Sequence, residues 1–362
     1  MPESVDAFAA PVVAIYRPVA GSEASQDAIR AAGCELLVEP FDQPGRVPDA
    51  RARQAAVVMG ATFRGGIMDG TWFDQFPQLR LVSKYTIGYD DIDLDAATAR
   101  GIAISHCPTE ANWGGVAEGA MALMLALSKR VRERDSAVKA GGWRDPALEG
   151  RYIGAREDGY AGLTIGIIGL GRVGVRFAEL LRPWRVRLIA CDPYITDEVF
   201  AHLGAERVDL ESLLQTADIV SVHCNLTRET RGLIDAQHIA QMKTGAILIN
   251  TARGAIVDID ALLAGLDVGR PAQAALDVFP EEPIENIERL RAYGNQLLLS
   301  PHMVAANEGG TLRTAIPWAT QAAFDALSGL FPKRVVNPEV EDQWRQRFAS
   351  RKLIERKRYV QD

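Results

Sequence analysis

The chain has 362 residues, of which 48% are hydrophobic, and this length exceeds the usual size of a single core, so two domains are expected. Its formal net charge of −7 offers no broad basic face, which argues against nucleic acid as a partner. The N-terminal residues 1–6 carry acidic residues where a signal peptide needs basic ones, and no apolar run reaches membrane-spanning length. We therefore expect a soluble, cytoplasmic protein without a membrane partner.

The first hundred residues alternate short strand-like runs with helical stretches. The runs are residues 12–15, 36–38, 55–59, 79–82 and 102–104. Such alternation predicts a parallel sheet with helices on both faces. Beyond Pro108, residues 117–127 are rich in Ala and Leu, which predicts a largely buried helix that links two domains.

A second alternating series begins at Leu163, with runs at 163–168, 187–190, 219–222, 246–249, 274–276 and 296–299. Six strands would complete a doubly wound sheet. Residues 310–330 predict an Ala-rich helix, and residues 334–340 would return the chain to the first domain. Residues 344–359 mix basic residues with aromatic and aliphatic ones, which favours a solvated or subunit-packing helix, with a basic interaction tail as the alternative.

Three glycines follow the first strand of the second series in a G-x-G-x-x-G pattern. Gly169 would allow a tight turn, Gly171 would let backbone N–H groups approach a pyrophosphate, and Gly174 would let the next helix pack closely. Asp192 ends the following strand, where a carboxylate accepts hydrogen bonds from a ribose 2′-OH and repels a 2′-phosphate. The arrangement predicts a dinucleotide site that favours NAD over NADP, although Arg172 or Arg185 could soften that preference if either reaches the ribose. A bland Gly-rich turn is the alternative.

The fold class is therefore α/β, with two doubly wound parallel-sheet domains. Residues 109–303 are expected to form a Rossmann NAD-binding domain, and residues 1–108 and 304–362 a smaller, discontinuous, flavodoxin-like substrate domain. The cysteines are widely spaced and form no C-x-x-C pair, which favours buried free thiols in a reducing compartment, and no metal site is expected. They are Cys34, Cys107, Cys191 and Cys224.

Polar residues follow three neighbouring strands of the second series, where open α/β sheets place their ligands. They are Arg253, Glu282 and His302. An arginine can hold a carboxylate through two hydrogen bonds, and a histidine can exchange a proton near neutral pH. A carboxylate beside the histidine would orient it and favour its protonated form. Each residue alone is more often structural, but the set suits a small anionic 2-oxo or 2-hydroxy acid.

These motifs resemble those of the D-isomer-specific 2-hydroxyacid dehydrogenases, including phosphoglycerate dehydrogenases and glyoxylate and hydroxypyruvate reductases. The similarity runs from about Lys84 to Val340 and includes the glycine turn and residues 250–258, 276–283 and 300–302. The resemblance implies that Arg253 binds the substrate carboxylate and carbonyl oxygen, that His302 is the acid/base, and that Glu282 pairs with it. The cofactor contacts predicted in this way are Gly169, Gly171, Arg172, Val173, Gly174, Asp192, His223, Thr251, Ala252 and Asp277, the last of these on the nicotinamide carboxamide.

The resemblance also places a substrate-binding loop after a strand of the first series. Ile87 and Gly88 would offer backbone N–H groups to the carboxylate, with an ordinary strand-to-helix turn as the alternative. The chain departs from the family at Gly119, where His is common, and at Asn225, where Pro is usual. Trp113, before the linking helix, is either a pocket wall or a packing residue of the hinge.

The sequence thus predicts an NAD-dependent oxidoreductase that interconverts a small 2-oxo acid and a D-2-hydroxy acid. By resemblance it would be a homodimer that associates through the helix at 117–127 and its surroundings. An NAD(H)-sensing binding protein of co-repressor type, without significant turnover, is the alternative. A formate dehydrogenase ranks lower, because by resemblance it requires Gln where Glu282 stands.

Overall fold

The computed structural model describes residues 10–39, 41, 48–308, 310 and 312–359. The chain divides into two compact units, Met1–Asn112 with Glu308–Asp362, and Trp113–Asn307. These boundaries lie a few residues beyond the expected ones at 108 and 303. The first unit is thus discontinuous in sequence, as its two segments come from opposite ends of the chain.

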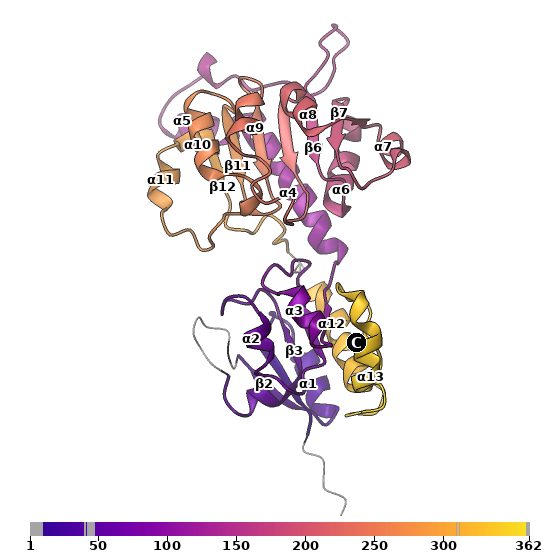
Figure 1. Cartoon of the computed structure of the whole chain (residues 1–362). Coiled ribbons are helices and arrows are strands. Elements are labelled where there is room, and N and C mark those ends of the chain that lie inside the picture. The colour runs from indigo at the N-terminus through magenta and orange to yellow at the C-terminus, as the bar shows by residue number, and fades with distance from the viewer. Residues whose placement is uncertain (1–9, 40, 42–47, 309, 311, 360–362) are drawn as a thin grey trace, which may run out of the picture. The chain divides into compact units, whose positions relative to one another are not determined.

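The first unit contains a parallel sheet whose strands lie in the order β2-β1-β3-β4-β5 (Figure 1). This order is that of flavodoxin-like folds. The strands are β1 (Val12–Arg17), β2 (Glu35–Val38), β3 (Ala55–Gly60), β4 (Leu81–Lys84) and β5 (Ala103–Ser105). The helices are α1 (Glu23–Ala31), α2 (Gly70–Phe73), α3 (Leu94–Ala99), α12 (Ile316–Leu327) and α13 (Glu341–Phe348).

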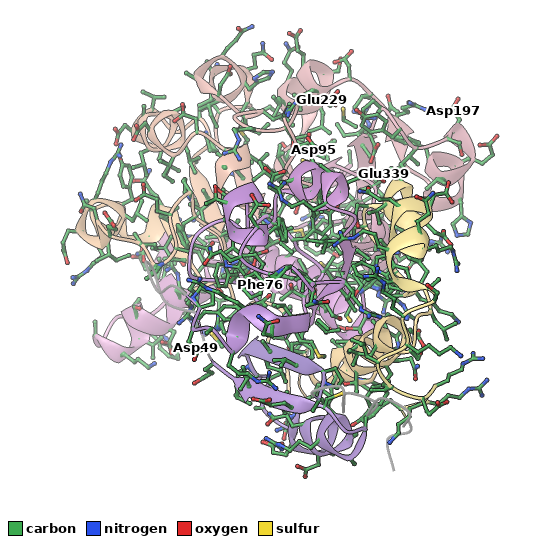
Figure 2. All side chains as sticks on the ribbon, turned by 60° about the horizontal axis from the view of Figure 1, so that its bottom comes forward. Asp49, Phe76, Asp95, Asp197, Glu229 and Glu339 are labelled. Carbon is green, nitrogen blue, oxygen red and sulfur yellow. The ribbon has the colours of Figure 1, made fainter. Side chains whose placement is uncertain are left out.

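Both faces of this sheet are buried, because alternate residues of each strand pack into different clusters. Val13 contributes to the cluster that includes α12 and α13, whereas its neighbour Val12 contributes to the other. The second cluster is rich in aromatic residues, and in it Phe76 packs against Trp72. Figure 2 labels Phe76. In contrast to these buried rings, acidic side chains such as Asp197 and Glu229 of the second unit are exposed at the protein surface. The sheet is therefore covered on both sides, as expected for parallel strands.

The C-terminal segment departs from its prediction. The helix expected at 344–359 spans only Glu341–Phe348, and the face that carries its buried aromatic residues packs within its own unit, while the opposite face is exposed. Trp344 is fully buried, its Nε1–H donates to the Arg80 carbonyl at 2.8 Å, and its ring contacts Phe331 and Phe348. Trp344 and Phe348 are four residues apart and so share one helix face. That face packs into the core of its own unit.

The neighbouring segment returns to the first sheet. The helix expected at 310–330 begins only at Ile316, after a 3₁₀ turn at η6 (Arg313–Ala315). Within the segment 334–340, Val335 bridges Ser105 in antiparallel fashion, and Asn337 Oδ1 accepts a hydrogen bond from the Ile104 N–H at 2.9 Å. Residues 334–340 therefore pack against β5.

The second unit contains a parallel sheet of seven strands in the order β12-β11-β10-β9-β6-β7-β8 (Figure 1). Its strands are β6 (Thr164–Ile168), β7 (Arg187–Cys191), β8 (Glu206–Arg207), β9 (Ile219–Val222), β10 (Ile247–Asn250), β11 (Gln273–Leu276) and β12 (Leu297–Leu299). The first six, in chain order, follow the Rossmann arrangement 3-2-1-4-5-6. The expected six strands omitted β8, because its two exposed, charged residues give no hydrophobic pattern.

Helices cover the second sheet and bury one core on each face. They are α4 (Glu110–Ser128), α5 (Val131–Lys139), α6 (Arg172–Leu181), α7 (Asp197–Leu203), α8 (Leu210–Thr216), α9 (Ala236–Gln241), α10 (Ile259–Asp267) and α11 (Ile287–Arg291). Helix α4 contains the stretch 117–127 and buries Leu123, Met124 and Leu127, so the prediction of a largely buried helix agrees with the structure.

All four cysteines are free thiols. Cys34 and Cys107 are buried, as predicted, whereas Cys191 and Cys224 are partly exposed. Among the described residues, no helix combines the length and the apolar character needed to cross a membrane.

Candidate active site

The three strands expected to deliver the polar residues are neighbours in the second sheet. Strands β10, β11 and β12 run parallel, with Asn250 opposite Leu276 and Leu276 opposite Leu299. Their carboxyl ends therefore meet at one edge of the sheet, where ligands bind in open α/β folds. Arg253 and His302 come just after this edge.

His302 and Glu282 form a direct pair. Nδ1 of His302 lies 2.7 Å from Oε2 of Glu282, while Oε1 of Glu282 accepts the Phe279 N–H at 2.9 Å. The His302 backbone is in the left-handed region, with φ +55°, and its N–H donates to the Asp277 carbonyl at 2.7 Å. Such a conformation is uncommon outside glycine and clusters at functional sites. It turns the ring toward Glu282, and half of the side chain stays exposed.

The charged forms of His302 and Glu282 stabilise each other. The hydrogen bond to Glu282 raises the pKa of His302 above its ordinary value, although burial and the nearby Arg253 charge oppose the rise. Burial alone would raise the pKa of Glu282, but hydrogen bonds from His302 and from the Phe279 N–H outweigh it and lower that pKa. The pair therefore favours an imidazolium beside a carboxylate.

The loop that carries Arg253 is shaped by Asn250 and Gly254. The Asn250 side chain donates to the Arg253 carbonyl at 2.9 Å and accepts the Ala252 N–H at 3.0 Å. A Cβ on Gly254 would lie 1.9 Å from the carbonyl carbon of Phe279. Only glycine lets this loop rest against the turn that positions Glu282. Asn250 and Gly254 both lie in the motif 250–258, but the motif alone does not show these roles, which depend on contacts with other segments.

Asp277 supports the chain that follows His302. Its carboxylate is buried, and Oδ1 accepts the Met303 N–H at 2.9 Å and the Val304 N–H at 3.3 Å. This contact was not foreseen, since the sequence placed Asp277 only at the cofactor. The carboxylate thus holds the backbone on the far side of the histidine.

Helix α4 packs closely against the same segment. A Cβ on Gly119 would lie 2.5 Å from the Val304 Cβ and 2.8 Å from the Val304 carbonyl oxygen. One turn earlier, a Cβ on Gly115 would lie 3.3 Å from the Ala305 Cα. The departure at Gly119 therefore has a local reason: the larger side chain that is common there in the family would collide with Val304.

The glycine turn has the geometry of a dinucleotide site. Gly169 has φ +94°, and its Cβ would lie 2.6 Å from the Cys224 nitrogen, so the turn is tight. A Cβ on Gly174 would lie 2.0 Å from the Gly169 oxygen, which requires close packing of α6 on β6. At Gly171 no atom of the protein lies within 4 Å of the Cβ position, so the helix N-terminus faces open space. The tight turn, the open helix N-terminus and the close packing of α6 on β6 are the features expected of the three glycines at a pyrophosphate-binding turn.

Polar atoms at the neighbouring strand ends also fit a cofactor. Asp192 follows β7, and its two oxygens accept the Leu170 N–H at 2.8 Å and the Tyr194 N–H at 2.9 Å, which leaves lone pairs for a ribose. Within the described residues, Thr251 Oγ1 and His223 Nδ1 are buried without a hydrogen-bond partner. Burial lowers the pKa of His223 to about 3, so it is neutral. Buried polar atoms without a partner are rare unless a ligand or water meets them.

The remaining cofactor candidates lie at the same edge of the second sheet. Arg172 and Val173 open α6, and Ala252 follows Thr251 after β10. The structure thus brings all the predicted catalytic and cofactor residues to the carboxyl edge of one sheet.

Ile87 and Gly88 belong to the first unit, in the loop after β4. The Ile87 carbonyl is 2.9 Å from His106 Nδ1, and the Gly88 carbonyl accepts the Thr86 hydroxyl at 2.8 Å. Nearby, the buried Lys84 pairs with Asp91, although burial lowers its pKa. The Thr86 side chain thus ties the loop to itself.

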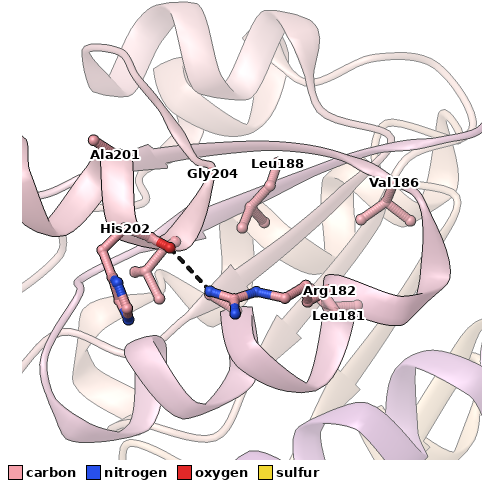
Figure 3. Close-up of a pocket in the computed structure, with 9 residues that line it drawn as sticks. Leu181, Arg182, Val186, Leu188, Ala201, His202 and Gly204 are labelled. Carbon is pink, nitrogen blue, oxygen red and sulfur yellow. Dashed lines mark hydrogen bonds between the residues drawn. The ribbon is translucent and has the colours of Figure 1, made fainter.

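A separate cavity of about 520 Å³ lies at the opposite edge of the second sheet (Figure 3). It is lined by the ends of α6 and α7 and by the start of β7, and Arg182 donates to the His202 carbonyl at 2.9 Å across it. Because it lies at the amino end of β7, it is distinct from the glycine turn and from His302.

The fold and site define a two-domain α/β protein that binds a dinucleotide and carries a histidine–carboxylate pair at the cofactor edge. Residues 121–304 match the family model described as "D-isomer specific 2-hydroxyacid dehydrogenase, NAD binding domain". The chain therefore belongs to the D-isomer specific 2-hydroxyacid dehydrogenase family, whose members are NAD-dependent oxidoreductases, and its cofactor is NAD.

Individual relatives agree with this assignment. The chain is 37% identical over 279 residues to the glyoxylate reductase of Thermofilum pendens, which covers 75% of this chain and 79% of the relative. It is 34% identical over 319 residues to the D-3-phosphoglycerate dehydrogenase of Mycobacterium leprae, covering 86% of this chain but only 57% of that longer protein. The crystal structure of a glyoxylate reductase from Paecilomyes thermophila superimposes with a TM-score of 0.79 at 24% identity, over 91% of this chain and 99% of the other, and so supports the fold.

Proposed function

We propose that this protein interconverts a small 2-oxo acid and the corresponding D-2-hydroxy acid, with NAD as the hydride carrier. The observation that carries the proposal is the His302–Glu282 pair, 2.7 Å apart and near Arg253, at the edge of the sheet that also bears the glycine turn. Relatives named glyoxylate reductase and D-3-phosphoglycerate dehydrogenase support this substrate class.

When bound, NADH would supply the hydride for the reduction of the carbonyl group. Arg253 would hold the substrate carboxylate and polarise the carbonyl oxygen. His302 would donate a proton to that oxygen as negative charge develops on it, and would take the proton back in the reverse reaction. Since Nδ1 is engaged by Glu282, the other ring nitrogen, Nε2, is the one available to the substrate. Glu282 orients the ring and keeps it protonated.

The residues that would hold the dinucleotide act in three groups. Gly169, Gly171 and Gly174, with Arg172 and Val173, would bind the pyrophosphate at the start of α6. Asp192 would bind the adenosine ribose and exclude a 2′-phosphate. At the nicotinamide end the contacts would come from His223, Thr251, Ala252 and Asp277.

The first unit would be the substrate domain. The backbone N–H groups of Ile87 and Gly88 would complete the carboxylate site when substrate binds.

A homodimer is part of the proposal. Association is expected through the stretch 117–127 of α4 and its surroundings, which include the segment that follows the helix. Here Val131, Val138, Trp143 and Tyr152 are exposed, Trp143 by 76%. Exposed apolar patches typically mark interfaces, and these side chains would contribute to the one proposed here. A monomeric mass in solution would contradict the proposed homodimer.

The free thiols further favour a cytoplasmic location.

Site-directed variants test the proposed roles. His302→Ala should lose most of kcat while the Kd for NADH stays near that of the wild type, because the imidazole acts on the substrate. Arg253→Ala should raise KM and lower kcat together. His202→Ala, an exposed histidine in the same unit at the opposite sheet edge, is the matched control and should change neither. Near-native turnover by His302→Ala would remove the acid/base assignment.

A further inference from the structure

The loop after β4 binds its carbonyl oxygens within the first unit and leaves N–H groups unpaired. The Thr86 carbonyl accepts the Cys107 N–H at 3.1 Å, and the Gly88 carbonyl accepts the Thr86 hydroxyl at 2.8 Å. Between them, the Ile87 carbonyl lies 2.9 Å from His106 Nδ1. Within the described part of the chain, the N–H groups of Ile87 and Gly88 donate to no protein atom. Successive backbone N–H groups that lack a protein acceptor can bind an anion.

His106 comes from the neighbouring strand end and is held in place there. It directly follows β5, which pairs with β4, and it is partly buried. Its backbone N–H donates to the Arg334 carbonyl at 3.2 Å, and its ring meets the Tyr89 ring edge-on, with 5.9 Å between the centroids. Because the Ile87 carbonyl can only accept, the hydrogen of this contact must be on Nδ1. The imidazole is therefore a donor to the loop.

The Ile87 carbonyl and the Gly88 N–H belong to the same peptide group. This peptide bond is trans, so its C=O and N–H bonds lie in one plane and point in opposite directions. The hydrogen bond from His106 therefore also fixes the direction of the Gly88 N–H, which points away from the imidazole. Accepting a hydrogen bond at the carbonyl polarises the peptide group and strengthens its N–H as a donor.

We propose that His106 is a positioning residue for the substrate carboxylate. Its imidazole holds the Ile87–Gly88 peptide so that the Gly88 N–H donates to the carboxylate of the 2-oxo acid, and it acts through this peptide, not on the reacting atoms. The inference rests on the proposed function, in which Ile87 and Gly88 complete the carboxylate site. It adds that the direction of one donor in that site is set by a side chain from the next strand end.

The ends of the loop are held by other groups. Lys84, the last residue of β4, is buried and pairs with Asp91, which also accepts the Phe63 N–H at 2.5 Å. The backbone hydrogen bond between Cys107 and Thr86 does not involve the imidazole either. Removal of the imidazole should therefore free the Ile87–Gly88 peptide to rotate while the loop stays attached to the sheet.

Two substitutions at His106 separate the donor from the rest of the residue. His106→Ala removes the imidazole but keeps the backbone hydrogen bond to Arg334, whereas the side-chain amide in His106→Asn supplies an N–H donor near the position of Nδ1. With glyoxylate, we expect His106→Ala to raise KM about tenfold, because a hydrogen bond to a charged group is lost, and to leave kcat nearly unchanged. His106→Asn should return KM to within about threefold of the wild type.

Binding of oxamate to the complex with NADH gives a second readout that does not depend on turnover. Oxamate carries the carboxylate of a 2-oxo acid, but its amide carbonyl resists hydride addition. Its Kd, followed by NADH fluorescence, should rise about tenfold in His106→Ala and recover in His106→Asn. The Kd for NADH should stay unchanged in both variants, and the exposed His202→Ala is the control that should alter neither constant.

The outcomes separate this inference from the proposed function. If the wild type binds oxamate and reduces a 2-oxo acid but His106→Ala does both equally well, the positioning role is wrong and the proposed function stands. Equal losses in His106→Ala and His106→Asn would show that the ring and not its N–H donor matters, which also overturns the inference. A wild type that neither binds oxamate nor reduces any 2-oxo acid overturns both.

Discussion

Replacing Gly254 by alanine tests whether the contact between two loops positions the catalytic groups. The new Cβ would lie 1.9 Å from the Phe279 carbonyl carbon, whereas ordinary contact begins near 3.4 Å. The loops must therefore separate by about 1.5 Å, the difference of these distances. Arg253 precedes Gly254, and the Phe279 N–H holds Glu282, so both groups would shift. A misplacement of about 1 Å can cost roughly 100-fold in rate.

We therefore expect Gly254→Ala to lower kcat/KM for a 2-oxo acid by about 100-fold, while the Kd for NADH changes little. Overpacking should also cost about 1–3 kcal/mol of folding free energy, which thermal unfolding would report. Gly159→Ala is the matched control: its φ is +93°, so alanine is strained there, but no atom lies within 4 Å of its Cβ position. Near-native kcat/KM in a folded Gly254→Ala protein would show that this contact between the loops does not position Arg253 and Glu282.

Three further predictions concern the proton, the cofactor and the C-terminal helix. The pKa of His302 is raised mainly by Glu282, so reduction, which needs protonated His302, should fall as pH rises through that raised pKa. In Glu282→Gln the falling limb of kcat/KM against pH should move to lower pH, and an unmoved limb would contradict the pairing. Asp192→Asn removes a negative charge beside the ribose, so the ratio of kcat/KM with NADH to that with NADPH should decrease; an unchanged ratio would count against Asp192 as the selector. Trp344→Ala should cost about 3–5 kcal/mol in urea unfolding, because the ring is fully buried, whereas the exposed Gln343→Ala on the same helix should stay within about 0.5 kcal/mol. A loss below about 1 kcal/mol at Trp344 would mean that α13 is not part of the core.

The strands of both sheets could be predicted because their apolar runs are regular. Strand β9 has the bounds that the pattern indicated, and most others differ by one or two residues. Strand β8 was missed because an edge strand of two charged residues leaves no apolar signal. The C-terminal helix was misjudged for another reason: the spacing of Trp344 and Phe348 shows that they share a face, but a pattern cannot show what covers that face.

For the site, the sequence could supply the residue types and the strand ends, but not the packing between them. The motif order places Arg253, Glu282 and His302 at one edge of the second sheet. The close approach of Gly254 to Phe279, and of Gly119 to Val304, joins segments that lie far apart in the chain. Such contacts depend on tertiary packing, which has no local signature. The roles of the catalytic and cofactor residues remain predictions until the variants are measured.

The most direct test of the central claim is NADH oxidation at neutral pH with glyoxylate and hydroxypyruvate, alongside other 2-oxo acids and with NADPH in parallel. We expect turnover with at least one 2-oxo acid, a D-configured product wherever the product is chiral, and higher kcat/KM with NADH than with NADPH. Tight NADH binding without turnover on any 2-oxo acid would contradict the account and would favour an NAD(H)-sensing role.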